Sequence, residues 1–182
     1  LNEWITRGIE PPASRVPMRS QGTLVSATEA VPRNLPTLPY DALYTSAYLS
    51  DHAQLPPKVL GRYEVLVPLA DADGMSVAGI RSLPLAVPKA SYTAWNPRAV
   101  GYGPGNLFPL QGAISPFAST KAERIATKDP RLSLEERYAT SESYVNAVKT
   151  VSQRYVKERI LLQEDADRNV ERAKSDTLSQ IK

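Results

Sequence analysis

The 182-residue sequence contains no cysteine and a single histidine, His52. The lack of cysteine excludes a disulfide framework and thiolate metal sites. No apolar run approaches the roughly 18 residues that a membrane helix requires, so we expect no membrane span. Any histidine-dependent catalysis within this chain would have to use His52. The compartment in which the protein works is left open by these observations.

Strong charge of either sign is also missing. Lysine and arginine together number 22 against 19 aspartates and glutamates, which gives a net charge of only +3. The basic residues are interleaved with acidic ones, whereas a nucleic-acid-binding protein normally carries a basic stripe with aromatic residues. The sequence therefore predicts no nucleic-acid partner.

Proline is abundant, with 16 residues against nine glycines, and it is concentrated before Ala118. This composition predicts three segments of what we expect to be one domain. Residues 1–60 would form a helix end and a proline-rich covering coil without secondary structure of its own, because proline fixes φ and removes backbone donors. Residues 61–119 would form a β-hairpin with extended and loop regions, and residues 120–182 a helical C-terminal segment.

The first residues, LNEWITRG, have the pattern of a helix that is ending. Trp4 and Ile5 lie on one helical face, Gly8 is a natural C-cap, and two prolines follow. No N-cap residue precedes Leu1. We interpret the chain as a fragment, the C-terminal piece of a longer protein.

The strongest strand signal is residues 62–69 (RYEVLVPL), with 75–80 (MSVAGI) as its expected partner. Asp73 and Gly74 between them predict a two-residue type I′ turn. The same stretch resembles half of a calcium loop, but with Gly74 at loop position 6 an EF-hand needs oxygen ligands at positions 1 and 12, where Leu69 and Ile80 stand. We therefore favour the hairpin and expect Asp71 to form an Asx turn with nearby amides.

Four helices are predicted in the tail, near 121–127, 134–138, 142–161 and 164–175. Thr120 with Glu123 and Ser133 with Glu136 fit the capping-box spacing at the starts of the first two. The third carries an apolar stripe that we expect to pack in the core, formed by Tyr144, Val148, Val151 and Tyr155. The predicted fold class is α+β, with proline-rich coil, one hairpin, short strands and three or four C-terminal helices.

No complete active site is visible. His52 lies in an expected surface loop, and no G-x-S-x-G nucleophile elbow occurs. We therefore assign no catalytic residue, no metal site and no cofactor. The most distinctive polar and aromatic cluster contains Trp95, Asn96 and Arg98. These side chains could line a substrate pocket and orient an ester or carboxylate, or the segment could be a structural turn in which Trp95 anchors the core.

Several stretches, taken together in order and spacing, resemble the C-terminal region of bacterial alpha/beta hydrolase domain proteins. The family tends to have glycine where Ala94 stands, and Pro97 is also atypical. Residues 30–60, which contain His52, match poorly. The matching stretches are 1–17 (LNEWITRGIEPPASRVP), 63–81 (YEVLVPLADADGMSVAGIR), 85–98 (LAVPKASYTAWNPR), 112–138 (GAISPFASTKAERIATKDPRLSLEERY) and 155–168 (YVKERILLQEDADR).

The resemblance implies a parent chain that is a serine esterase, with its nucleophile elbow and acid–base partners upstream of Leu1. None of those catalytic residues can be placed on this sequence. The chain would contribute structure and part of the pocket for a small-molecule ester, with the upstream catalytic portion as its partner. The alternative is a non-catalytic protein-binding or structural module.

Overall fold

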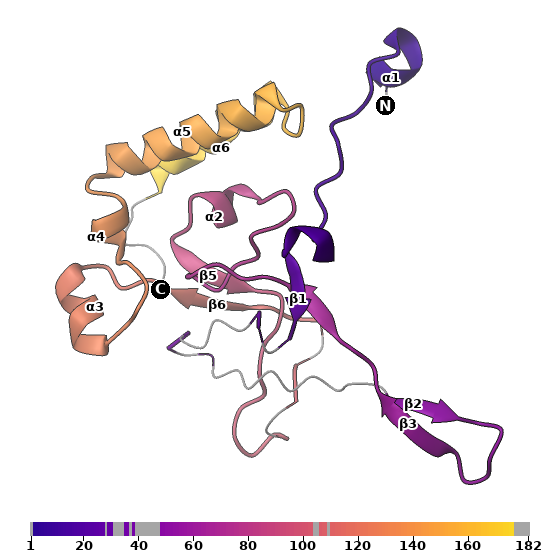
Figure 1. Ribbon diagram of the computed structural model, residues 1–182. Helices are drawn as coiled ribbons and strands as arrows, with labels where there is room; N and C mark the ends of the chain where they lie inside the picture. The colour runs from indigo at the N-terminus through magenta and orange to yellow at the C-terminus, as the bar shows by residue number, and fades with distance from the viewer. Residues whose placement is uncertain are drawn as a thin grey trace. The chain divides into compact units, whose positions relative to one another are not determined.

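The computed structural model describes residues 2–27, 29–30, 35–36, 38, 48–103, 106–108 and 110–176. The chain divides into two compact units, each built from separate stretches of sequence. Unit 1 comprises Leu1–Val16, Ile80–Ala90 and Pro116–Lys182, and unit 2 comprises Pro17–Gly79 and Ser91–Ser115. Helices characterise unit 1, and short paired strands characterise unit 2 (Figure 1). The mixed α+β fold class predicted from the sequence is confirmed.

Among the described residues, the longest helices of unit 1 are α5 and α6, which pack against each other as a helical hairpin (Figure 1). Residues 158–162 connect them. No helix in the described part of the chain is long and apolar enough to cross a membrane. The helices are α1 (Asn2–Arg7), α2 (Leu83–Ala86), α3 (Lys121–Thr127), α4 (Leu134–Arg137), α5 (Ser141–Lys157) and α6 (Gln163–Ser175).

The apolar core of unit 1 lies under α5. Tyr144 and Val148 of the predicted stripe are buried in it, and Val151 packs against it half-buried. The Tyr138 and Tyr144 rings meet edge to face with centroids 5.2 Å apart, an arrangement favoured by the ring quadrupoles. Each fully buried side chain of this size contributes roughly 1.5–3 kcal/mol to folding. The cluster consists of Val87, Phe117, Leu134, Tyr138, Tyr144, Val148 and Ala173.

The predicted helix starts are largely confirmed. Ser133 and Glu136 form the expected capping box of α4. At α3 the Thr120 side chain accepts from the Glu123 amide, but the Glu123 carboxylate accepts from Ser119 rather than from the cap residue. Helix α5 begins one residue earlier than predicted and ends at Lys157, with Thr140 as its N-cap. These starts follow sequence closely because capping is a local interaction.

In the described part of the chain the strands form three two-stranded sheets, one of them a local hairpin and the others paired over longer separations. β1 (Leu24–Ser26) pairs antiparallel with β4 (Leu66–Pro68), and β2 (Tyr48–Asp51) pairs antiparallel with β3 (Lys58–Arg62). β5 (Ala90–Thr93) pairs with β6 (Ala113–Pro116). A 3₁₀ turn, η1 (Arg19–Gln21), precedes β1.

Two predictions about this region are wrong. The proline-rich segment was expected to lack secondary structure of its own, yet it contains η1, β1 and β2. The expected strand 62–69 is split between β3 and β4, and β4 pairs with β1. The expected pairing with residues 75–80 is limited to an antiparallel bridge between Ala70 and Ser76 and to the Val77 amide, which donates to the Leu69 carbonyl at 2.9 Å. An apolar segment more than 40 residues earlier in the chain supplies the partner, which a local turn signal cannot indicate.

The turn at 71–74 also differs from the type I′ prediction. Gly74 has φ 81°, whereas Asp73 is not among the residues with positive φ, and type I′ needs positive φ at both positions. The Gly74 amide donates to the Asp71 carbonyl at 2.9 Å, so the turn begins at Asp71. The Asp71 carboxylate accepts from the amides of Asp73 and Met75, both at 3.0 Å. The predicted Asx turn is confirmed.

Candidate functional site

The segment containing Trp95, Asn96 and Arg98 follows β5 in unit 2 and pairs through its backbone with residues 106–108. The Phe108 amide donates to the Asn96 carbonyl at 2.8 Å, and the Arg98 amide donates to the Asn106 carbonyl at 3.0 Å. The Thr93 hydroxyl donates to the Trp95 carbonyl at 2.5 Å. The three predicted side chains therefore lie on one short, hydrogen-bonded loop.

The exposed guanidinium of Arg98 lies 5.7 Å from the centre of the Phe108 ring, within the range of a cation–π contact. Its Nε donates to the Leu107 carbonyl at 3.4 Å. No other contact of the guanidinium is made by the described residues, so one of its edges can meet a carboxylate or carbonyl oxygen. Trp95 and Asn96 are half-buried, so this loop could contribute to a pocket mouth; their substrate-binding role stays a prediction.

His52 lies in the turn after β2 and is exposed. The neighbouring Asp51 carboxylate accepts from the Ala53 amide at 2.9 Å and from the Gln54 side-chain amide at 3.0 Å, so it does not orient the imidazole. A catalytic triad needs the histidine held between an acid and a nucleophile. The described residues around His52 do not form that arrangement.

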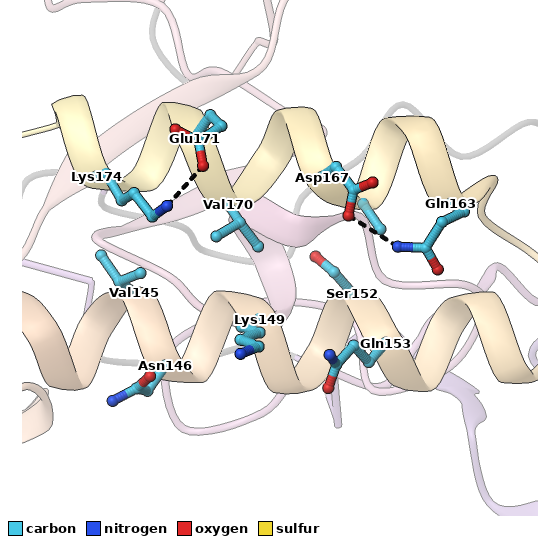
Figure 2. A pocket seen from close by; sticks show the side chains of 11 residues that line it. Val145, Asn146, Lys149, Ser152, Gln153, Gln163, Asp167, Val170, Glu171 and Lys174 are labelled. Carbon is cyan, nitrogen blue, oxygen red and sulfur yellow. Dashed lines mark hydrogen bonds and ion pairs between the residues drawn. The ribbon is translucent and has the colours of Figure 1, made fainter.

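A pocket of about 340 Å³ lies between α5 and α6 (Figure 2). Ser152 and Ala166 form its buried part. Its rim is polar and mostly exposed, and two pairs on α6 lie along it: Gln163 with Asp167 at 2.8 Å, and Lys174 with Glu171 at 2.6 Å. In Figure 2 the residue order along the two helices runs in opposite directions, so α5 and α6 are antiparallel.

A buried ion pair lies between α3 and α4. The guanidinium of Arg131, 4% exposed, donates through two nitrogens to the Asp129 carboxylate at 3.0 and 2.7 Å and to the Pro116 carbonyl at 3.1 Å. Burial by itself raises the pKa of Asp129, but hydrogen bonds from Arg131 and the charges of Arg131 and Arg124 outweigh burial and lower it. This pair fixes the loop that joins the two helices.

A second pair lies alongside. The Arg124 guanidinium donates to both oxygens of the Glu136 carboxylate at 2.7 and 3.1 Å, and the Ser133 amide donates to it at 3.0 Å. The hydrogen bond from Arg124 and that from the Ser133 backbone lower the pKa of Glu136 to about 2. Since both acids are fully engaged by structural partners, neither offers a reactive carboxylate.

A family described as alpha/beta hydrolase domain matches residues 1–171, nearly the whole chain. The chain belongs to the alpha/beta hydrolase domain family. The resemblance to alpha/beta hydrolase domain proteins is thereby confirmed. Comparison with curated proteins and with solved structures gives no match.

Membership of the alpha/beta hydrolase domain family indicates a hydrolase-type function. No group of three or more histidine, aspartate or glutamate side chains that could hold a metal occurs among the described residues. In the stretch that resembles half of a calcium loop, the Asp71 carboxylate accepts from backbone amides instead.

Two features escaped the sequence reading. The Arg131–Asp129 pair lies in the stretch DPRLSLEE, where only the capping pattern was recognised. Ser152 lies on the α6-facing side of α5 (Figure 2), and a serine among polar residues gives no sign of burial in the sequence. Its position four residues after Val148 and three before Tyr155, on the face of the apolar stripe, is the signal that could have drawn attention to it.

Proposed function

We propose that this member of the alpha/beta hydrolase domain family is part of a serine esterase whose nucleophile and acid–base residues are encoded upstream of Leu1. The observation that carries the proposal is the family match over residues 1–171 in a sequence without a nucleophile elbow. His52, the only histidine, is exposed and unoriented by Asp51. We therefore place the catalytic residues outside this chain.

The chemistry would be acyl transfer. The upstream serine, deprotonated by a histidine, attacks the carbonyl carbon of a carboxylic ester, and the alcohol leaves with the proton. Water then cleaves the acyl-enzyme to give the acid and the free serine. This chain supplies the structural surroundings and, through Trp95, Asn96 and Arg98, a contact to the substrate.

Arg98 is the residue best suited to that contact, because the described residues leave part of its guanidinium without a partner and its guanidinium lies over the Phe108 ring. In the longer protein we expect Arg98→Ala to raise KM for a carboxylate-bearing ester by about tenfold, since hydrogen bonds to charged groups contribute about 1.5–3 kcal/mol. Arg62→Ala is the matched control, because Arg62 lies over the Tyr48 ring at 5.4 Å in the same way. Equal KM values for the two variants would remove Arg98 from the pocket.

The proposal is tested by measuring p-nitrophenyl ester hydrolysis by the 182-residue chain and by the product of the longer reading frame. We expect turnover only from the longer protein, and we expect it to be abolished by a serine-directed fluorophosphonate. Serine-dependent turnover by the 182-residue chain would show that the active site lies within it. A start codon close to Leu1 would also contradict the proposal.

One observation favours the alternative, a protein-binding module. The β2–β3 hairpin exposes large apolar side chains, with Leu55, Val59 and Leu60 all more than half exposed. A two-stranded hairpin is marginally stable alone and gains from a covering surface. If the longer reading frame lacks a nucleophile elbow, binding of a partner at this hairpin becomes the better explanation.

A further inference from the structure

The segment that follows α1 is held on the connection between α5 and α6. Residues 9–16, called the strap below, have no secondary structure and are mostly exposed. The Arg15 guanidinium pairs with the Glu158 carboxylate at 2.9 Å. The Arg159 guanidinium donates to the Glu10 carbonyl at 2.7 Å. The strap and the connection both belong to unit 1, and because the two contacts use consecutive residues of the connection, they fix the strap at one place.

The backbone conformation of Arg159 is one that normally calls for glycine. Arg159 has φ 60°, in the left-handed region, directly after the end of α5. Its amide donates to the Val156 carbonyl at 2.9 Å, and the Ile160 amide donates to the Tyr155 carbonyl at 3.0 Å. These two bonds form a Schellman motif, in which glycine is the usual residue at this position because it has no Cβ. Arginine therefore stands here with a strained backbone.

Another helix of unit 1 ends in the same way. Lys128, after α3, has φ 55°. Its amide donates to the Ile125 carbonyl at 3.2 Å, and the Asp129 amide donates to the Arg124 carbonyl at 3.0 Å. The Lys128 side chain is exposed and has no hydrogen-bond or ion-pair partner among the described residues. The helix ending itself thus needs no side-chain contact, and the bond from Arg159 to the strap is an addition to it.

We propose that Arg159 and Arg15 form a clasp that fixes the strap on the α5–α6 connection. Arg159 is its main element, because it bonds to the backbone of the strap, whereas the pair of Arg15 with Glu158 is partly exposed and is weakened by salt. One consequence rests on the proposed function. In the longer protein the upstream catalytic portion is joined to unit 1 through α1 and the strap, so the clasp positions this chain's pocket contacts for the ester.

The clasp is tested by ¹⁵N order parameters of the 182-residue chain at Ala13, Ser14 and Val16. We expect values of about 0.8, typical of ordered backbone, in the parent chain and below about 0.6 in Arg159→Gly. Arg159→Asn should give the same loss, because asparagine tolerates the left-handed conformation but its side chain is too short for the bond. Lys128→Gly, the matched control at the equivalent helix end, should leave the strap unchanged.

Urea midpoints separate release of the strap from unfolding. Glycine at either left-handed position relieves backbone strain, so Arg159→Gly and Lys128→Gly should each have a midpoint no lower than that of the parent chain. The clasp is overturned if the order parameters of the strap are already below about 0.6 in the parent chain. It is also overturned if they are unchanged in both Arg159→Gly and Arg159→Asn.

The positioning role is tested by p-nitrophenyl ester hydrolysis in the longer protein. Arg159→Gly should raise KM about three- to tenfold while kcat stays within about twofold, because this chain is proposed to contribute binding contacts and not the catalytic residues. Lys128→Gly should leave both constants unchanged. An unchanged KM in an active Arg159→Gly enzyme overturns the positioning role. A longer protein that is inactive even without a substitution contradicts the proposed function instead, and the order parameters then decide the clasp.

Discussion

Arg131 holds a buried charge whose partner, Asp129, is only two residues away in the sequence. The guanidinium also donates to the Pro116 carbonyl and lies 5.1 Å from the centre of the Phe117 ring. Removing one partner of a buried pair leaves the other charge desolvated and uncompensated, which is worse than never burying the pair. The loss of stability on substituting one member of the pair therefore depends on whether the other charge remains buried.

We expect Arg131→Ala to lower the free energy of unfolding by about 3–5 kcal/mol, because it leaves the Asp129 carboxylate buried without its counter-ion. Urea denaturation followed by circular dichroism measures this loss. The double variant Asp129→Asn/Arg131→Met should recover part of it, since it removes both charges. Arg168→Ala, at an exposed ion pair with Asp165, should cost less than about 1 kcal/mol. A loss no larger for Arg131→Ala than for Arg168→Ala would contradict the burial argument.

Glu136 makes stability depend on pH in the acid range. Its pKa is lowered from 4.5 to about 2, chiefly by the hydrogen bond from Arg124. A lowered pKa in the folded state means that the unfolded chain binds a proton first as the pH falls. The stabilisation by Glu136 is thus fully present above pH 4.5 and is lost between pH 4.5 and about 2.

Glu136→Gln should reduce this acid-range loss of stability and should also lower stability at neutral pH, where the charged pair with Arg124 is missing. Urea midpoints measured at intervals from pH 7 to pH 2 give the comparison. Asp129, whose pKa is also lowered, remains in the variant, so the dependence is reduced rather than abolished. Parallel curves for the two proteins would mean that Glu136 contributes nothing to the pH dependence.

At the scale of elements, the helices of the tail could be predicted from sequence and the strand pairing could not. Ser133 with Glu136 marks the start of α4 by contacts within one turn, and the α5 stripe repeats at helical spacing. By contrast, β4 pairs with β1 far away in the sequence. The turn begins at Asp71 and is not the predicted type I′ turn centred on Asp73 and Gly74, because the Asp71 carboxylate accepts from two backbone amides.

The stripe of α5 gives the element-scale prediction. Val148 is 4% exposed in the core of unit 1, and Val148→Ala should lower the free energy of unfolding by about 2 kcal/mol through lost burial and the cavity left behind. Lys157→Ala, an exposed position on the same helix, should stay within about 0.5 kcal/mol of the parent chain. Chemical denaturation of the two variants side by side is the measurement. Equal stabilities would show that α5 does not depend on this face.

At the scale of the whole molecule, sequence reasoning placed the chain in its family but could describe the candidate sites only in part. Trp95, Asn96 and Arg98 were found because a tryptophan, an amide and a guanidinium stand together in four residues. Ser152 could not be found in that way, because its burial depends on α6 packing against α5. A pocket formed by two helices has no contiguous sequence pattern.

The two units differ in how much apolar surface they bury, and this predicts unequal local stability. Unit 1 contains a cluster of seven buried apolar residues, whereas the buried apolar residues among those described in unit 2 are Ala30, Leu35 and Met75. Segments with few buried contacts open at lower free energy than the global transition. Hydrogen exchange under native conditions, followed by mass spectrometry, should therefore show slow amides in α5 and α6.

Amides of β2 and β3 should exchange faster by about two orders of magnitude, which corresponds to roughly 3 kcal/mol of difference in opening free energy. The Val148→Ala variant supplies the control, because its lost core contacts should speed exchange in α5 while leaving β2 and β3 unchanged. Equal protection of the two units, or acceleration of both by Val148→Ala, would mean that the chain opens as one cooperative body. In that case the strands of unit 2 would take their stability from unit 1 rather than from their own buried residues.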